Sequence, residues 1–113
     1  MQIHKDVKHG ILRRAYGNVM KREEMFKAFI KRLCESGIAS EVFLIGSRVR
    51  GDHTSSSDFD VVVVIEDGDI LEVAEKVSAL KKEPLPVDVV VLTKDDLQDP
   101  IYREMLKDRV KIY

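Results

Sequence analysis

The stretch FLIGSRVRGDHTSSSDFDVVVV, residues 43–64, contains the features that decide the fold. It begins and ends as apolar β-strand, and between these ends lie a Gly-Ser turn, two arginines and two aspartates one residue apart. Asp58 and Asp60 run directly into four consecutive valines. Because an unpaired buried carboxylate is costly, acids at the start of a buried strand require a compensating partner.

The sequence on either side of this stretch alternates between helical and strand patterns. Apolar residues at helical spacing predict an amphipathic helix over residues 19–36, with Asn18 as N-cap and Gly37 as C-cap. Other segments complete the expected order: strands over 41–45, 58–65 and 87–92, a loop over 46–57, a helix over 70–82, a helical region that opens at a Thr93–Asp96 capping box and restarts at Pro100, and a small strand at the C-terminal VKIY. This order predicts an α/β (α+β) domain with a small mixed sheet packed with helices.

Composition excludes several classes of protein. The chain has 113 residues and a formal net charge of −1, which fits one domain and argues against direct nucleic-acid binding through a general basic surface. Cys34 is the single cysteine, so no disulfide can form within the chain. No apolar run reaches the ~18 residues needed to span a bilayer, and the N-terminus has no apolar core typical of a secretory signal. We therefore expect a cytoplasmic protein that does not enter a membrane.

Three acids are candidate metal ligands. Asp58 and Asp60 share one face of their strand, because successive strand residues point to opposite faces. A bare D-x-D pair is more often a loop cap followed by a solvated strand position, but Asp88 interrupts a second apolar strand, PVDVVVL. If the two strands pair, the three carboxylates converge and suit Mg²⁺, which prefers hard oxygen ligands. Such a triad is typical of metal-assisted phosphoryl or nucleotidyl transfer.

The Gly-Ser turn supplies candidate phosphate ligands. Gly46 allows a sharp turn close to a ligand, and the Ser47 hydroxyl can donate to phosphate oxygens. Arg48 and Arg50 add positive charge, and Gly51 again frees the backbone. Strand alternation cannot decide which arginine faces inward, since both lie in the predicted loop. The pattern is not a Walker P-loop, because no Lys-Ser/Thr pair follows the glycines.

Taken together, these positions resemble the signature of the DNA polymerase β superfamily of nucleotidyltransferases, and in particular its minimal nucleotidyltransferase branch. The matching residues are Gly46, Ser47, Gly51, Ser57, Asp58, Asp60 and Asp88. Phe59 departs from the pattern, since Ile or Leu is commoner between the aspartates. The resemblance covers residues 19–113, the expected nucleotidyltransferase domain, whereas residues 1–18 look like an N-terminal extension.

The resemblance implies a palm-like sheet on which Asp58, Asp60 and Asp88 are catalytic and hold two Mg²⁺ ions. Gly46, Ser47, Arg48, Arg50, Gly51 and Ser57 would bind the nucleoside triphosphate, with ATP as substrate. Because the chain ends soon after its third predicted strand, we expect another molecule, most plausibly a protein partner, to supply the acceptor group. The sequence also allows a homo-oligomer. Some members of this branch are antitoxins whose partner is a HEPN-domain ribonuclease toxin. The main functions in competition are AMP transfer to a hydroxyl of such a partner and a non-catalytic antitoxin that neutralises the partner by contact. Nucleotide transfer to a small molecule or to tRNA is a weaker third alternative, because the sequence shows no acceptor domain and no basic surface.

Overall fold

The computed structural model describes residues 21–51, 58–82 and 85–113 of the chain. The proposed N-cap Asn18, the N-terminal extension over residues 1–18 and the nucleotide-binding candidate Ser57 lie outside the described residues.

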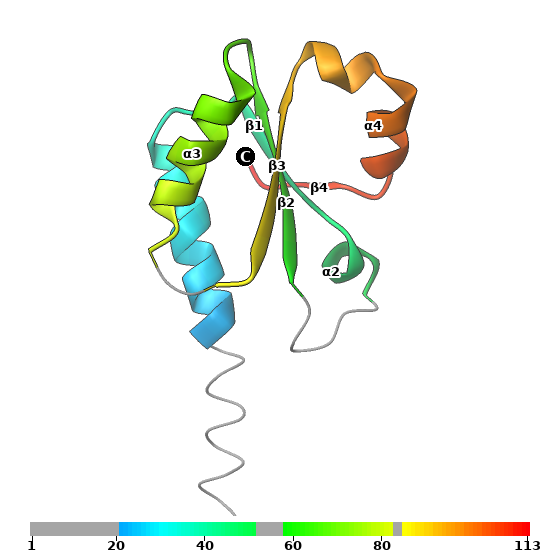
Figure 1. The fold of residues 1–113 in the computed structure, drawn as a ribbon. Coiled ribbons are helices and arrows are strands. Elements are labelled where there is room, and N and C mark those ends of the chain that lie inside the picture. Colours follow the sequence, from blue (N-terminus) through cyan, green and yellow to red (C-terminus); the bar gives the residue numbers. More distant parts are fainter. Residues whose placement is uncertain (1–20, 52–57, 83–84) are drawn as a thin grey trace, which may run out of the picture.

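The centre of the fold is a four-stranded sheet with the order β3-β2-β1-β4 (Figure 1). Its strands are β1 (Glu41–Ile45), β2 (Phe59–Ile65), β3 (Val87–Thr93) and β4 (Val110–Lys111). β1 runs antiparallel to β2 and to β4, whereas β2 and β3 run parallel. The sheet is therefore mixed, as the order of the predicted elements indicates. The predicted small C-terminal strand is also present, as β4.

Two of the described helices, α3 (Ile70–Leu80) and α4 (Pro100–Met105), begin directly after an aspartate whose side chain accepts from their first N–H groups. A helix occupies residues 21–35, called the first helix below, and it is followed by α2 (Ser47–Arg50), α3 (Ile70–Leu80), the 3₁₀ helix η1 (Asp95–Gln98) and α4 (Pro100–Met105). Asp69 accepts a hydrogen bond from the Leu71 N–H at 2.9 Å, and Asp99 accepts one from the Ile101 N–H at 2.9 Å. Such N-caps stabilise a helix by about 1 kcal/mol each.

Two local expectations need correction or refinement. The segment expected to be loop over residues 46–57 contains the single-turn helix α2. The Thr93–Asp96 capping box forms, with the Thr93 N–H donating to Asp96 at 3.0 Å and the Asp96 N–H donating to Thr93 Oγ1 at 3.3 Å. However, it opens a 3₁₀ helix, and the α-helix starts only at Pro100, where the prediction places the restart.

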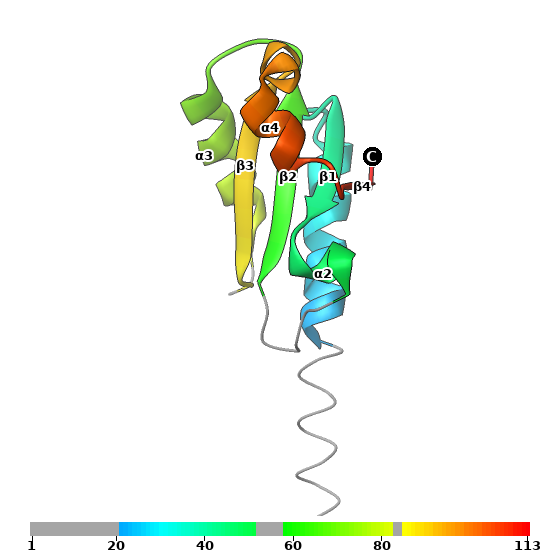
Figure 2. The same ribbon diagram turned by 90° about the vertical axis from the view of Figure 1, so that its right-hand side faces the viewer.

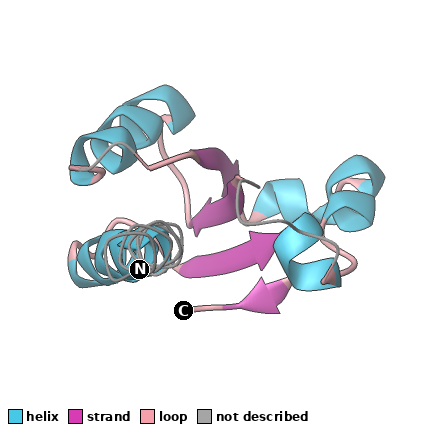
Figure 3. Ribbon diagram, turned by 90° about the horizontal axis from the view of Figure 1, so that it is seen from below, coloured by secondary structure: helices cyan, strands magenta, loops and turns pink. Residues whose placement is uncertain are grey.

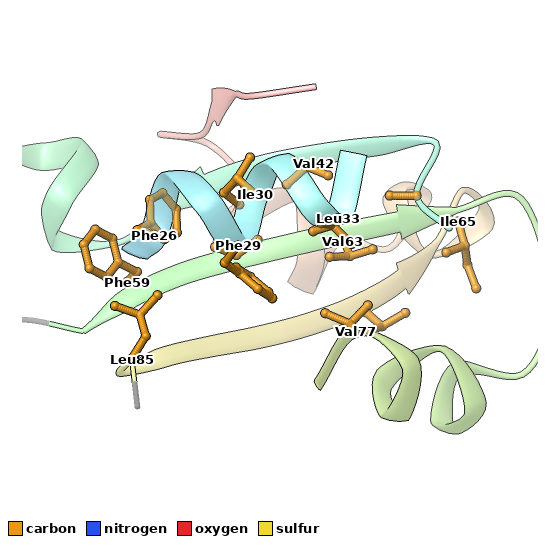
Figure 4. Close-up of a cluster of buried hydrophobic side chains, with 13 residues drawn as sticks. Phe26, Phe29, Ile30, Leu33, Val42, Phe59, Val63, Ile65, Val77 and Leu85 are labelled. Carbon is orange, nitrogen blue, oxygen red and sulfur yellow. The ribbon is translucent and has the colours of Figure 1, made fainter. Parts of the chain in front are cut away.

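Both faces of the sheet are covered by helices (Figure 3). Alternate residues of β2 divide between two clusters of buried side chains. Phe59, Val61, Val63 and Ile65 pack with the first helix and α3, through residues such as Phe29, Leu33 and Val77 (Figure 4). Val62 and Val64 pack on the other face with Phe43, Leu92 and Leu106, the last of which directly follows α4. The aspartates alternate with Phe59 and so belong to this second face.

In the part of the chain that the structure describes, no helix has the length and apolar character to cross a membrane.

Candidate active site

Asp60 and Asp88 lie side by side on neighbouring strands. The parallel pairing of β2 with β3 places Asp60 directly opposite Asp88 in register. Neighbouring strands are about 4.8 Å apart, and register partners in a parallel pair project to the same face of the sheet. The two aspartate-bearing strands are therefore neighbours in the sheet, and their pairing brings Asp88 beside Asp60.

Burial and neighbouring negative charge make the ionisation of Asp60 less favourable than usual. The pKa of Asp60 is raised above its ordinary value, first by partial burial and then by the negative charges of Asp88 and Asp58. Asp58 precedes β2 and is exposed, as is Asp88, whereas Asp60 is partly buried. A carboxyl whose ionisation is opposed by burial and by two neighbouring negative charges is one that a bound cation would stabilise in its charged form.

Gly46 brings the phosphate-binding candidates against this group. The β1–β2 register pairs Ile45 with Asp60, so the chain leaves β1 directly beside this carboxylate. Gly46 has φ 84° and ψ −157°, a backbone conformation that is essentially restricted to glycine. A Cβ at this position would collide with Asp60 Oδ2 and would lie 3.2 Å from Asp60 Cγ. Only glycine can therefore make this turn, and Ser47 follows it as the first residue of α2.

The structure separates the two arginines that the sequence could not distinguish. The positive charge of Arg50 lowers the pKa of Asp60, so its guanidinium lies within electrostatic range of the carboxylates. Arg48 instead has a buried side chain, 8% exposed, whose guanidinium lies over the Phe59 ring and pairs with Glu23. In this structure the charge of Arg50 acts on the Asp60 carboxylate, whereas the guanidinium of Arg48 contacts Phe59 and Glu23.

Sequence reasoning did not identify Glu23 or Phe26 as residues connected with the site. Phe26 stacks on Phe59, with 4.2 Å between ring centroids and an interplanar angle of 8°. The signal was present in the unusual aromatic residue between the two aspartates, but the first helix shows only ordinary amphipathic spacing. Nothing in that spacing indicates contact with this end of β2.

The carboxylates occupy the part of their sheet face that the helices leave uncovered. α4 lies over the C-terminal halves of β2 and β3, and α2 lies near the end of β1, so no described helix crosses the first residues of β2 and β3 (Figure 2). Val90 follows Asp88 on this face and is 37% exposed. A large partner could therefore approach Asp58 and Asp88 directly from solvent.

The donor set fits a divalent cation that is completed by substrate. Among the described residues, no group of three or more Asp, Glu, His or Cys side chains is arranged to hold a metal ion by itself. Mg²⁺ typically takes only one or two carboxylates, keeps several waters and binds substrate phosphates. The register pairing of Asp60 with Asp88, and the effect of the Asp58 charge on Asp60, suit such an open arrangement better than a fully enclosed one.

Comparisons with known proteins agree with this geometry. Residues 26–112 match the model of the nucleotidyltransferase domain family. The fold also matches the crystal structure of a protein from Sulfolobus solfataricus described as a "putative nucleotidyltransferase", with a TM-score of 0.63, 24% sequence identity, and coverage of 88% of this chain and 86% of that chain. No curated protein is similar enough in sequence to count as a match. Since the family model spans most of its length, the chain belongs to the nucleotidyltransferase domain family.

Proposed function

We propose that this protein is a metal-dependent nucleotidyltransferase that transfers AMP from ATP to a hydroxyl group of a protein partner, and that it acts as the antitoxin of a HEPN-type toxin. The observation that carries the catalytic part is the register of Asp60 with Asp88, directly beside the Gly46 turn. The family match supports nucleotidyl transfer in general. The acceptor and the antitoxin role rest on the resemblance to minimal nucleotidyltransferases.

Each group has a defined task in the proposed reaction. Asp58, Asp60 and Asp88 would hold Mg²⁺, which would neutralise charge on the phosphates. The Ser47 hydroxyl donates a hydrogen bond to the triphosphate, and Arg50 provides positive charge for it. The acceptor oxygen forms a bond to the α-phosphorus, the bond between the α-phosphorus and its bridging oxygen to the β-phosphate breaks, and pyrophosphate leaves. Asp88 receives the hydroxyl proton.

The shape of the uncovered face supports a macromolecular acceptor. Asp58 and Asp88 are exposed, so an acceptor hydroxyl can reach them without entering a closed pocket. Val90 adds an exposed apolar side chain to this face, next to Asp88. A protein that covers Val90 would exclude water from the carboxylates while it presents a serine, threonine or tyrosine hydroxyl.

A labelling experiment tests the proposal. The full chain is incubated with α-³²P-labelled ATP, Mg²⁺ and the protein encoded by the neighbouring gene, which the proposal expects to carry a HEPN domain, and transfer of label to that protein is measured. We expect labelling by the wild type and none by the Asp58→Asn/Asp60→Asn variant. Asp67→Asn/Asp95→Asn is the matched control, since it removes two exposed carboxylates outside the site and should label normally. Equal labelling by the two double variants would contradict the proposal.

The same variants address neutralisation by contact. If AMP transfer silences the toxin, Asp58→Asn/Asp60→Asn should leave the toxin active in a growth assay while the control double variant protects. Protection by both double variants would instead favour the non-catalytic antitoxin.

A further inference from the structure

Arg48 occupies an unusual environment for an arginine beside a phosphate-binding turn. Its side chain is only 8% exposed, and Nη1 donates to Glu23 Oε1 at 2.9 Å. The guanidinium carbon lies 3.8 Å from the centroid of the Phe59 ring. At this distance the planar cation stacks on the aromatic face, an arrangement that guanidinium forms better than the ammonium of lysine.

The Phe59 ring is held from both sides. Phe26 stacks in parallel with it at 4.2 Å between centroids. Because two groups this close cannot occupy the same face of one ring, Arg48 and Phe26 must lie on opposite faces. The result is a three-layer stack, Phe26–Phe59–Arg48, in which the ring of Phe59 is 2% exposed. Figure 4 shows the two rings side by side at the end of β2 nearest α2.

This stack joins the first helix to two of the elements that carry the site, β2 and α2. Phe26 belongs to the first helix, Phe59 opens β2, and Arg48 is the second residue of α2. Phe59 lies between Asp58 and Asp60, so fixing its backbone fixes the starting points of both carboxylates. Arg48 likewise follows the Gly46–Ser47 turn, so fixing its side chain fixes the turn. The Phe26 and Phe59 rings lie on the face of the sheet opposite the aspartates, and the Arg48 side chain that stacks on Phe59 is too buried to be readily reached by substrate.

We propose that Arg48 is a positioning residue for nucleotidyl transfer. By stacking on Phe59 and pairing with Glu23, it sets the distance between the phosphate-binding turn and the metal-binding aspartates without contacting the nucleotide. The inference deepens the proposed function and rests on it for its catalytic readout. Since a misplacement of about 1 Å can lower a rate about 100-fold, loss of this stack affects turnover more than it affects ATP affinity.

Arg48→Lys separates positioning from phosphate contact. A lysine that reached a phosphate would still serve as a point charge, so it would preserve function in a phosphate-contact role. It cannot reproduce the planar stack on Phe59. We expect Arg48→Lys to lower kcat by about 10- to 100-fold with little change in the KM for ATP. Arg50→Lys is the contrasting variant, because a phosphate-facing arginine replaced by lysine keeps its charge and should retain more of the activity.

Calorimetric titration of the full-length apoprotein with Mn²⁺ provides a readout that needs no enzymatic activity. Arg48→Lys preserves net charge, so weaker Mn²⁺ binding would reflect displaced carboxylates and not altered Coulomb attraction. We expect a severalfold loss of Mn²⁺ affinity. In the Phe59→Leu background, where the stack is already absent, Arg48→Lys should have little further effect on affinity or kcat.

Arg32→Lys controls for a purely structural effect. Arg32 Nε donates to the Leu80 carbonyl at 2.7 Å, so this arginine connects the first helix to α3. The contact lies at a distance from the aspartates. At a temperature where all variants are folded by circular dichroism, Arg32→Lys should retain wild-type kcat and Mn²⁺ affinity. Equal losses in Arg32→Lys and Arg48→Lys would overturn the positioning role.

The outcomes distinguish the two proposals. If the wild type transfers nucleotide and Arg48→Lys matches it in kcat and in Mn²⁺ affinity, the positioning role is wrong and the proposed function stands. If the wild type transfers nothing to its partner, but binds Mn²⁺ more tightly than Arg48→Lys does, the proposed function fails, and what stands is that Arg48 positions the metal-binding aspartates. An increase in KM alone would assign Arg48 to phosphate contact and overturn the inference.

Discussion

Replacing Gly46 by alanine tests the closest contact in the site, because this glycine turns the chain directly against the Asp60 carboxylate. Its φ of 84° and ψ of −157° lie in a region that costs other residues about 1–3 kcal/mol. The added Cβ would collide with Asp60 Oδ2 and lie 3.2 Å from Cγ, and overpacking of this kind costs about 1–3 kcal/mol. We expect the free energy of unfolding to fall by about 2–6 kcal/mol in total.

A double-mutant cycle separates the two contributions. Urea unfolding followed by far-UV circular dichroism is measured for Gly46→Ala in the wild-type and Asp60→Ala backgrounds. Truncating Asp60 removes the colliding carboxylate, so the cost of Gly46→Ala should shrink by about 1–3 kcal/mol. Gly37→Ala is the control for backbone strain alone, since Gly37 has φ 75° and its Cβ would meet no atom within 4 Å. An identical cost of Gly46→Ala in both backgrounds would refute the proposed collision.

Three further predictions concern charge, metal and helix capping. The raised pKa of Asp60 means that the folded state binds more protons than the unfolded state between the ordinary value of 3.8 and the raised value, so stability falls as pH rises through this window. The free energy of unfolding of Asp60→Asn, measured in urea titrations, should therefore rise relative to that of the wild type as the pH increases through this window. A difference between the two proteins that does not change with pH would contradict this. Saturating MgCl₂ should raise the melting temperature of the wild type by mass action, whereas the melting temperature of Asp60→Asn/Asp88→Asn should not change; an equal increase in both would place the cation elsewhere. Asp69→Ala removes the acceptor for the Leu71 N–H and should lower the free energy of unfolding by about 0.5–2 kcal/mol in the same denaturation assay, whereas no loss would show that the cap is dispensable.

The strands could be predicted from the sequence because their apolar runs are bounded by strong turn signals. β1 matches its predicted range, Glu41–Ile45, and β2 and β3 differ from theirs by one residue each. The pairing of β2 with β3 could not be predicted from the sequence. The alternation of side chains predicts which face of its strand Asp88 lies on, but it does not indicate which strand is the neighbour. The parallel register supplies that neighbour.

The short helix α2 could not be predicted from periodicity, because four residues complete only one turn. Its flanking glycines, Gly46 and Gly51, were identified, but as loop residues and phosphate-binding candidates. The helical turn is also what separates the arginines. Residues two apart on a helix point in directions that differ by about 200°, so Arg50 can accompany the aspartates while Arg48 turns to Phe59.

The stack of Arg48 on Phe59 also has a consequence for how this sequence can vary among its relatives. An aliphatic side chain at position 59 would offer no aromatic face for the guanidinium, and burying that cation without such a partner is costly. Substitutions at positions 48 and 59 should therefore occur together in evolution, with an aromatic residue accompanying arginine and a branched aliphatic residue accompanying a small or uncharged one. An alignment of homologues in which the two positions vary independently would contradict this expectation.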